Sequence, residues 1–81
     1  MPEIARFYGI VISLLYKEHN PPHFHAEYGE FRASFEIETM KMKGKFPKTA
    51  ERLVRQWAAP HKAELLKMWN EKKVIKLPPL D

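Results

Sequence analysis

The sequence predicts a small α+β domain, in which an antiparallel sheet of about four strands is covered on one face by a long C-terminal helix. Three observations support this fold class. Residues 3–38 are rich in β-branched and aromatic side chains and are divided by glycine turn signals. Residues 47–72 carry apolar side chains at the three- and four-residue spacing of an amphipathic helix. The length of 81 residues suits a single domain, residues 1–81, with a small core.

The first predicted hairpin covers residues 3–16 and is divided at Gly9, which marks either its turn or a bulge. The segment Ile10–Tyr16 carries apolar side chains on both faces, so we expect it to lie inside the sheet. At Met40–Lys45, methionine alternates with lysine. This pattern favours a short edge strand whose lysines discourage pairing with another sheet.

The second predicted hairpin covers residues 23–38 and turns at Gly29-Glu30. Glycine accepts the positive φ that the first position of a type II′ turn requires. With this turn, apolar side chains of the two strands face one another, and so do the polar ones. The predicted pairs are Phe24 with Phe35, Ala26 with Ala33, Tyr28 with Phe31, His23 with Glu36, His25 with Ser34 and Glu27 with Arg32.

The predicted helix over residues 47–72 contains Pro60, which removes one backbone hydrogen bond. Because the apolar stripe keeps its phase across the proline, we expect a kinked helix, or two helices joined near Ala59 with little change of direction. Residues 74–81 contain two adjacent prolines and are expected to form a tail that lies on the body or pairs briefly at a sheet edge.

The composition limits the class of protein. Hydrophobic residues make up 44% of the chain and charged residues 30%, as in soluble globular proteins. No apolar run approaches the roughly 20 residues of a membrane span, and Met1–Glu3 lacks the features of a signal peptide, so we expect a cytoplasmic protein that does not bind membranes. The absence of cysteine excludes disulfides, a thiolate nucleophile and cysteine-bound zinc.

The net charge of +4 is unevenly distributed along the chain. Residues 1–40 hold three basic and six acidic side chains, whereas residues 41–81 hold eleven basic and four acidic ones. The basic second half predicts an acidic partner, either a nucleic acid or an acidic protein, unless its lysines form only a solvated surface.

The segment HNPPHFHAEYG, residues 19–29, gathers three of the four histidines. Its two prolines, Pro21 and Pro22, cannot continue a strand ladder and therefore predict a stiff corner. Side chains alternate between faces along the strand that follows. One face of this strand carries His23, His25 and Glu27, and the other carries apolar residues.

Acid–base chemistry without a metal is the leading interpretation of this polar face. One imidazole would take a proton from a 2′-hydroxyl of RNA, and a second group would donate a proton to the leaving oxygen. The candidate catalytic residues are His23, His25 and Glu27. The candidate phosphate-binding residues are Lys17, Arg32, Lys41 and Lys43, whose positive charge would stabilise the phosphate. This mechanism needs no cofactor.

Two alternatives remain open for the same face. Two imidazoles and a carboxylate match the ligands of a divalent metal such as zinc, and a metal-dependent hydrolase would use His19, His23, His25 and Glu27. The third interpretation is a polar surface that binds a protein partner without catalysis.

Several of these segments resemble the small bacterial domain-of-unknown-function family 4160 (DUF4160). They are residues 1–10, residues 19–29 and the helix around Leu53, Trp57 and His61, so the resemblance covers nearly the whole chain. The positions that match the family motif are His19, Pro21, Pro22, His23, His25, Glu27 and Gly29. Pro60 departs from the uninterrupted helix of that family.

Members of this family are often encoded beside a small protein of domain-of-unknown-function family 2442 (DUF2442), in an arrangement that resembles a toxin-antitoxin pair. The resemblance therefore implies a toxin-like role and a small antitoxin-like protein partner. Together with the chemistry of the polar face, it predicts a toxin-like ribonuclease that acts on RNA.

Overall fold

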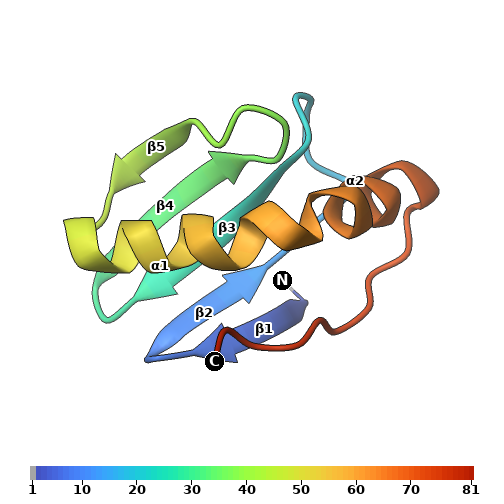
Figure 1. The fold of residues 1–81 in the computed structure, drawn as a ribbon. Helices are drawn as coiled ribbons and strands as arrows, with labels where there is room; N and C mark the ends of the chain where they lie inside the picture. The colour runs from blue at the N-terminus through green and yellow to red at the C-terminus, as the bar shows by residue number, and fades with distance from the viewer. Residues whose placement is uncertain (1) are drawn as a thin grey trace.

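A computed structural model describes residues 2–81 of the chain. Five antiparallel strands form one sheet in the order β1-β2-β3-β4-β5, and the helices cover one of its faces (Figure 1). The elements are β1 (Glu3–Phe7), β2 (Ile10–Ser13), β3 (His23–Tyr28), β4 (Phe31–Glu36), β5 (Met42–Lys45), α1 (Lys48–Ala58) and α2 (Lys62–Glu71). The α+β class is confirmed. The sheet has five strands in place of about four, because β5 pairs with β4.

The β3–β4 hairpin has the predicted register at all six pairs. Gly29 adopts a φ of 58°, as the first position of the predicted turn requires. The register places Phe24 beside Phe35, with their rings stacked and the centroids 5.4 Å apart. Trp57 of α1 meets Phe24 edge to face at 6.0 Å. This aromatic contact joins the sheet to α1, and the residues that alternate with Phe24 face away from α1.

The strands β1 and β2 form the first hairpin. Its turn lies at Tyr8-Gly9, where both φ angles are positive (48° and 79°), as in a type I′ turn. The pairing ends at Ser13, although the sequence predicted a hairpin that continues to residue 16. Since β2 lies between β1 and β3, the prediction of an interior strand is confirmed.

The predicted helix over residues 47–72 consists of α1 and α2, joined by a 3₁₀ turn at Ala59–His61. Pro60 lies in this turn, where its missing N–H does not interrupt a longer α-helix. The chain changes direction here, since α1 lies across the sheet and α2 is seen nearly end-on (Figure 1). The expectation of little change of direction is therefore wrong. Neither helix is long and apolar enough to cross a membrane.

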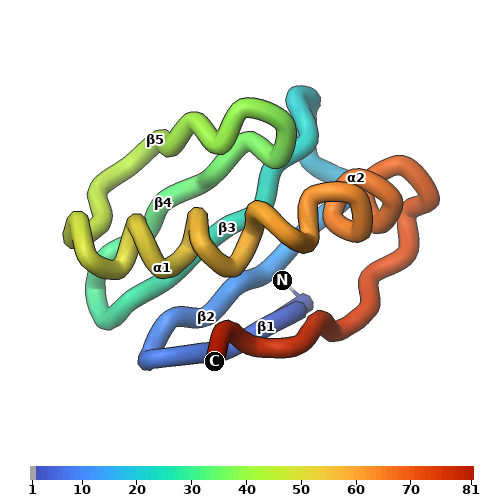
Figure 2. Tube along the Cα trace, in the orientation of Figure 1, coloured from blue at the N-terminus to red at the C-terminus, as the bar shows by residue number. Residues whose placement is uncertain are grey.

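The residues after α2 run back along β1 (Figure 2). The backbone N–H of Leu77 donates to the carbonyl oxygen of Ile4 at 2.8 Å, and the Leu77 side chain is buried. The indole N–H of Trp57 donates to the carbonyl oxygen of Pro78, also at 2.8 Å. The tail thus lies on the body and contacts the β1 edge, as predicted, while β5 forms the other edge of the sheet.

Replacing Gly44 by alanine should destabilise the fold more than replacing Gly29. Gly44 has a φ of 113°, and an added Cβ would lie 2.6 Å from the carbonyl oxygen of Arg32. Gly29 has open space around it, so Gly29→Ala carries only the strain of its positive φ. We expect losses in unfolding free energy of about 2–3 kcal/mol for Gly44→Ala and about 1 kcal/mol for Gly29→Ala, measured in urea. Equal losses would contradict the close approach of β5 to β4.

Candidate functional site

The loop between β2 and β3 brings Glu18 to the start of β3. Its Asn20–Pro21 peptide bond is cis. The carbonyl oxygen of Pro22 accepts a hydrogen bond from the N–H of Ile37, just beyond β4, at 3.0 Å. This bond ties the corner of the loop to the neighbouring strand, so that the loop lies against the end of the sheet.

Glu18, His23 and His25 form a compact group, called here the histidine–glutamate cluster. Oε1 of Glu18 lies 3.0 Å from Nε2 of His23 and 2.5 Å from Nε2 of His25. The two imidazole rings meet edge to face, with centroids 5.1 Å apart. All three side chains are partly buried, and one ligand atom from each lies within 4.8 Å of the others. The three residues therefore present their polar atoms to one point.

The orientation of the His23 ring is set from two sides. Its Nδ1 lies 2.8 Å from the carbonyl oxygen of Pro21, and the ring of Trp69 packs against it with centroids 5.2 Å apart. Because a carbonyl oxygen only accepts hydrogen bonds, Nδ1 carries the proton of this contact. Nε2 is then the ring nitrogen that His23 directs toward the cluster.

The two contacts of the His23 ring, with the carbonyl oxygen of Pro21 and with Glu18, are both to oxygen atoms. A neutral His23 that donates from Nδ1 would turn an Nε2 lone pair toward the carboxylate of Glu18, and two acceptors would face each other. Two arrangements resolve this conflict. Either His23 carries a second proton, or a cation lies where the two Nε2 atoms and Oε1 of Glu18 converge.

Glu18 is held in its ionised form by the two histidines. Burial raises the pKa of its carboxyl group, but the hydrogen bonds and charges of His25 and then of His23 outweigh this effect, so the pKa is lower than usual. The cluster therefore contains a carboxylate, which can pair either with imidazolium or with a metal ion.

Glu27 lies outside the cluster. Its carboxylate oxygen lies 3.1 Å from Nε of Arg32, across the β3–β4 pair. His19 also lies apart and lines a neighbouring hollow. Of the four residues predicted as metal ligands, the structure thus brings together the two histidines of β3, and Glu18 occupies the third position.

A hollow of about 170 Å³ adjoins the cluster. It is lined by His19, Asn20, Pro21, His23, Ser34, Glu36, Lys41 and Lys43. Two of the four predicted phosphate-binding residues, Lys41 and Lys43, therefore share a hollow with His23. The other two do not line this hollow: Lys17 is exposed in the loop before β3, and Arg32 lies on β4.

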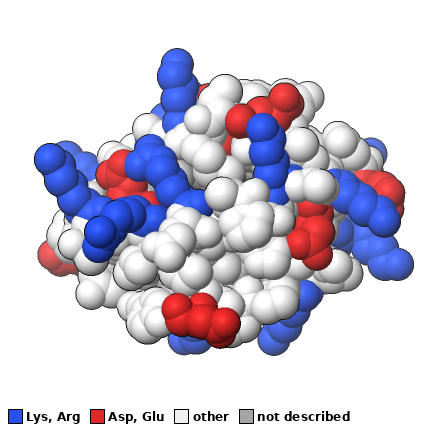
Figure 3. Space-filling view, viewed as in Figure 1, with Lys and Arg blue, Asp and Glu red and all other residues white. Residues whose placement is uncertain are grey.

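The strand register explains why Lys43, from the basic second half of the chain, lies on the same face of the sheet as His25. His25 pairs with Ser34 on β4, and Ser34 pairs with Lys43 on β5. Directly paired residues in a sheet project from the same face. On the helix-bearing face, by contrast, basic and acidic side chains are interspersed and form no single basic patch (Figure 3).

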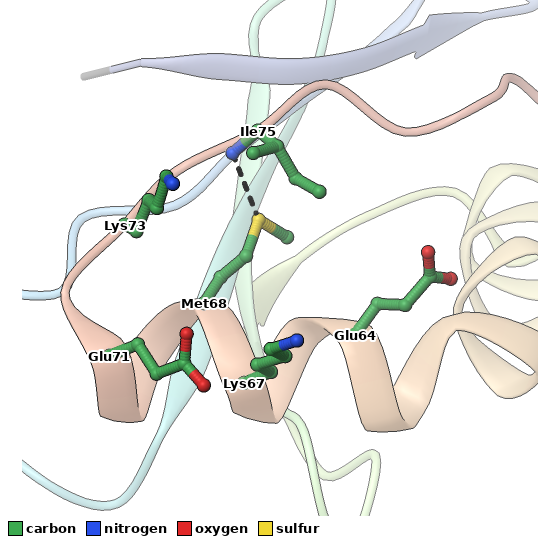
Figure 4. A pocket seen from close by; sticks show the side chains of 6 residues that line it. All are labelled: Glu64, Lys67, Met68, Glu71, Lys73 and Ile75. Atoms are coloured by element: carbon green, nitrogen blue, oxygen red, sulfur yellow. Dashed lines mark hydrogen bonds between the residues drawn. The ribbon is translucent and has the colours of Figure 1, made fainter.

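A second hollow, of about 280 Å³, lies between α2 and the tail (Figure 4). It is lined by Glu64, Lys67, Met68, Glu71, Lys73 and Ile75. The backbone N–H of Ile75 donates to Sδ of Met68 at 3.2 Å, which ties the tail to the helix. The residues predicted from the sequence as catalytic or phosphate-binding do not line this hollow, so the candidate site remains at the cluster.

Sequence reasoning missed Glu18 because face alternation applies only to residues within a strand. Glu18 precedes β3 and reaches the histidines through the loop. The available signal was the carboxylate of Glu18, directly before the HNPPHFH segment. A stiff corner at the two prolines can fold this residue back toward the histidines.

The lowered pKa of Glu18 predicts how stability depends on pH. A depressed pKa in the folded state contributes stability above the pKa of the unfolded chain, and that stability is lost as the pH falls through the folded value. The difference in unfolding free energy between the natural chain and Glu18→Gln should therefore shrink between pH 6 and pH 3, by up to about 1 kcal/mol. Urea denaturation across this range measures it. A difference that is constant with pH would mean that the carboxylate is not paired with the histidines.

Comparison with known proteins identifies the family of the chain. No curated protein and no solved structure matches it. Residues 9–70 match the family described as a domain of unknown function, DUF4160. The matched region is more than half of the chain and contains all three residues of the histidine–glutamate cluster. The chain therefore belongs to the DUF4160 family.

Proposed function

We propose that this protein is a metal-dependent hydrolase that cleaves RNA, with Glu18, His23 and His25 as the ligands of a divalent metal ion. The observation that carries the proposal is that the Nε2 atoms of His23 and His25 converge on one carboxylate oxygen of Glu18, at 3.0 and 2.5 Å. Histidines that bind metals usually donate the other ring N–H to a carbonyl or carboxylate. His23 has such a contact between its Nδ1 and the carbonyl oxygen of Pro21.

The contacts of the histidines favour this alternative over metal-free acid–base chemistry. A general base needs a free lone pair within reach of the substrate proton. Both Nε2 atoms are instead directed at one oxygen of Glu18, and Nδ1 of His23 is occupied by a backbone carbonyl. Glu27, the third residue predicted for that mechanism, is paired with Arg32.

The ligand set also suggests which chemistry the metal would supply. Two imidazoles and one carboxylate suit zinc or iron(II) and leave coordination positions open. An ion held by these residues would act as a Lewis acid and would activate a water molecule for hydrolysis. The protein would contribute ligands held in place by the Pro21 carbonyl and by Trp69.

The hollow beside the cluster supports a phosphate-containing substrate. Lys41 and Lys43 line it together with His23, so an anionic group bound there would lie next to the metal ligands. Ammonium groups stabilise the charge that develops on a phosphate during hydrolysis. Among phosphate-containing substrates, we propose RNA because of the basic second half of the chain and the toxin-like role that the family resemblance implies.

Zinc affinity should depend on Glu18 and not on Glu27. Glu18→Gln removes an ionised ligand and should weaken Zn²⁺ binding at least about tenfold, measured by calorimetry at pH 7. Glu27→Gln is the matched control, because Glu27 lies on the same face of β3 as the histidines but pairs with Arg32. The affinity of this variant for Zn²⁺ should be unchanged. A loss in Glu27→Gln without a loss in Glu18→Gln would instead support the ligand set predicted from the sequence.

Cleavage of RNA should require a metal ion, the histidine–glutamate cluster and the lysines of the neighbouring hollow. The purified chain should cleave total RNA when Zn²⁺ is present and stop when a chelator is added. His25→Ala should abolish cleavage, and Lys43→Ala should reduce it about tenfold or more, whereas Lys17→Ala should have little effect because Lys17 lies outside the hollow.

Two outcomes would redirect this proposal. Cleavage that survives chelation would favour the metal-free mechanism at His23 and His25. Intact RNA, with the neighbouring DUF2442-type protein co-purifying, would favour a binding module. The toxin-like role stays a prediction from the family resemblance. It requires that expression of the natural chain alone slows bacterial growth and that His25→Ala relieves the defect.

A further inference from the structure

We propose that the free edge of β5 is a docking site for an extended, acidic segment of a partner protein, which joins the sheet as a sixth strand. The two edges of the sheet differ. The tail contacts the β1 edge through the bond between Leu77 and Ile4. Within residues 2–81, no strand pairs with the outer side of β5, so its backbone groups there are free to bind another chain.

The register identifies which backbone groups face outward. The N–H of Glu36 donates to the carbonyl oxygen of Lys41 at 2.9 Å, so the backbone groups of Lys41 point toward β4. In an antiparallel pair this direction alternates along the strand. Lys43 and Lys45 therefore bond toward β4, while the N–H and carbonyl groups of Met42 and Gly44 face the open edge.

The side chains of this edge specify the charge of the partner. Four lysines lie on or beside it and are exposed: Lys41, Lys43, Lys45 and Lys48. Within the described chain none of them forms an ion pair with a carboxylate of this protein. An added strand with acidic residues at alternate positions would place its carboxylates beside Lys43 and Lys45.

The same lysines argue against a second copy of this chain as the occupant. Pairing β5 with β5 would place like charges opposite each other, which is destabilising and is a common protection of edge strands. A lysine-rich edge therefore discriminates between partners by charge. The docked strand would also lie next to Lys43, which lines the hollow beside the cluster. The docking site itself does not depend on metal binding or catalysis.

The test is a titration of the isotope-labelled full chain with a peptide of about six residues that alternates glutamate with valine. We expect chemical-shift changes and slowed hydrogen exchange at the amides of Met42 and Gly44. Lys43→Glu with Lys45→Glu should weaken binding at least about tenfold. Lys62→Glu with Lys67→Glu makes the same charge change at exposed positions of α2 and should leave the affinity within about twofold.

A second peptide separates strand addition from simple charge attraction. Methylation of alternate backbone nitrogens preserves the carboxylates but removes the N–H groups that would pair with β5. This peptide should bind at least about tenfold more weakly. The proposal is overturned if the acidic peptide does not bind, if the methylated peptide binds equally well, or if the protected amides lie outside β5.

Discussion

Burial of Phe24 under α1 is the contact on which both the sheet and the candidate site depend. Phe24 stacks on Phe35 and meets Trp57 edge to face, so the inward face of β3 is set by aromatic packing. Since side chains alternate along a strand, the same contact turns the two histidines of β3 away from α1, and His23 packs instead against Trp69 of α2. A slip of one residue would bury both imidazoles and expose the aromatic ring, which the energetics of burial strongly disfavour.

The site also relies on parts of the chain that are distant in sequence. Trp69 comes from α2, Glu18 from the loop before β3, and the lysines of the hollow from β5 and the turn before it. The change of direction at Pro60 is relevant here, because it separates α2 from α1. If α1 continued straight, Trp69 would not lie beside His23 at the start of β3. Figure 1 shows α2 turning away from the direction of α1.

Much of the fold could be predicted because its signals are local. Glycine turns and alternating apolar residues determined the β3–β4 register, down to the pairing of Glu27 with Arg32. In the structure this pairing is an ion pair between Glu27 and Arg32, which leaves Glu27 outside the histidine–glutamate cluster. The position of Glu18 was not predictable in the same way, because it depends on the bond between Pro22 and Ile37, which joins the loop to a different hairpin.

The tail along β1 has a consequence for any assembly built through the sheet. A sheet with two free edges can accept a strand on each side, and such contacts repeat without limit into fibres. Here the tail contacts the β1 edge through Leu77, so the strand addition proposed above would be confined to β5. A complex formed as proposed at β5 would then hold one partner segment for each copy of this protein, and would not be expected to grow into a filament through the β1 edge.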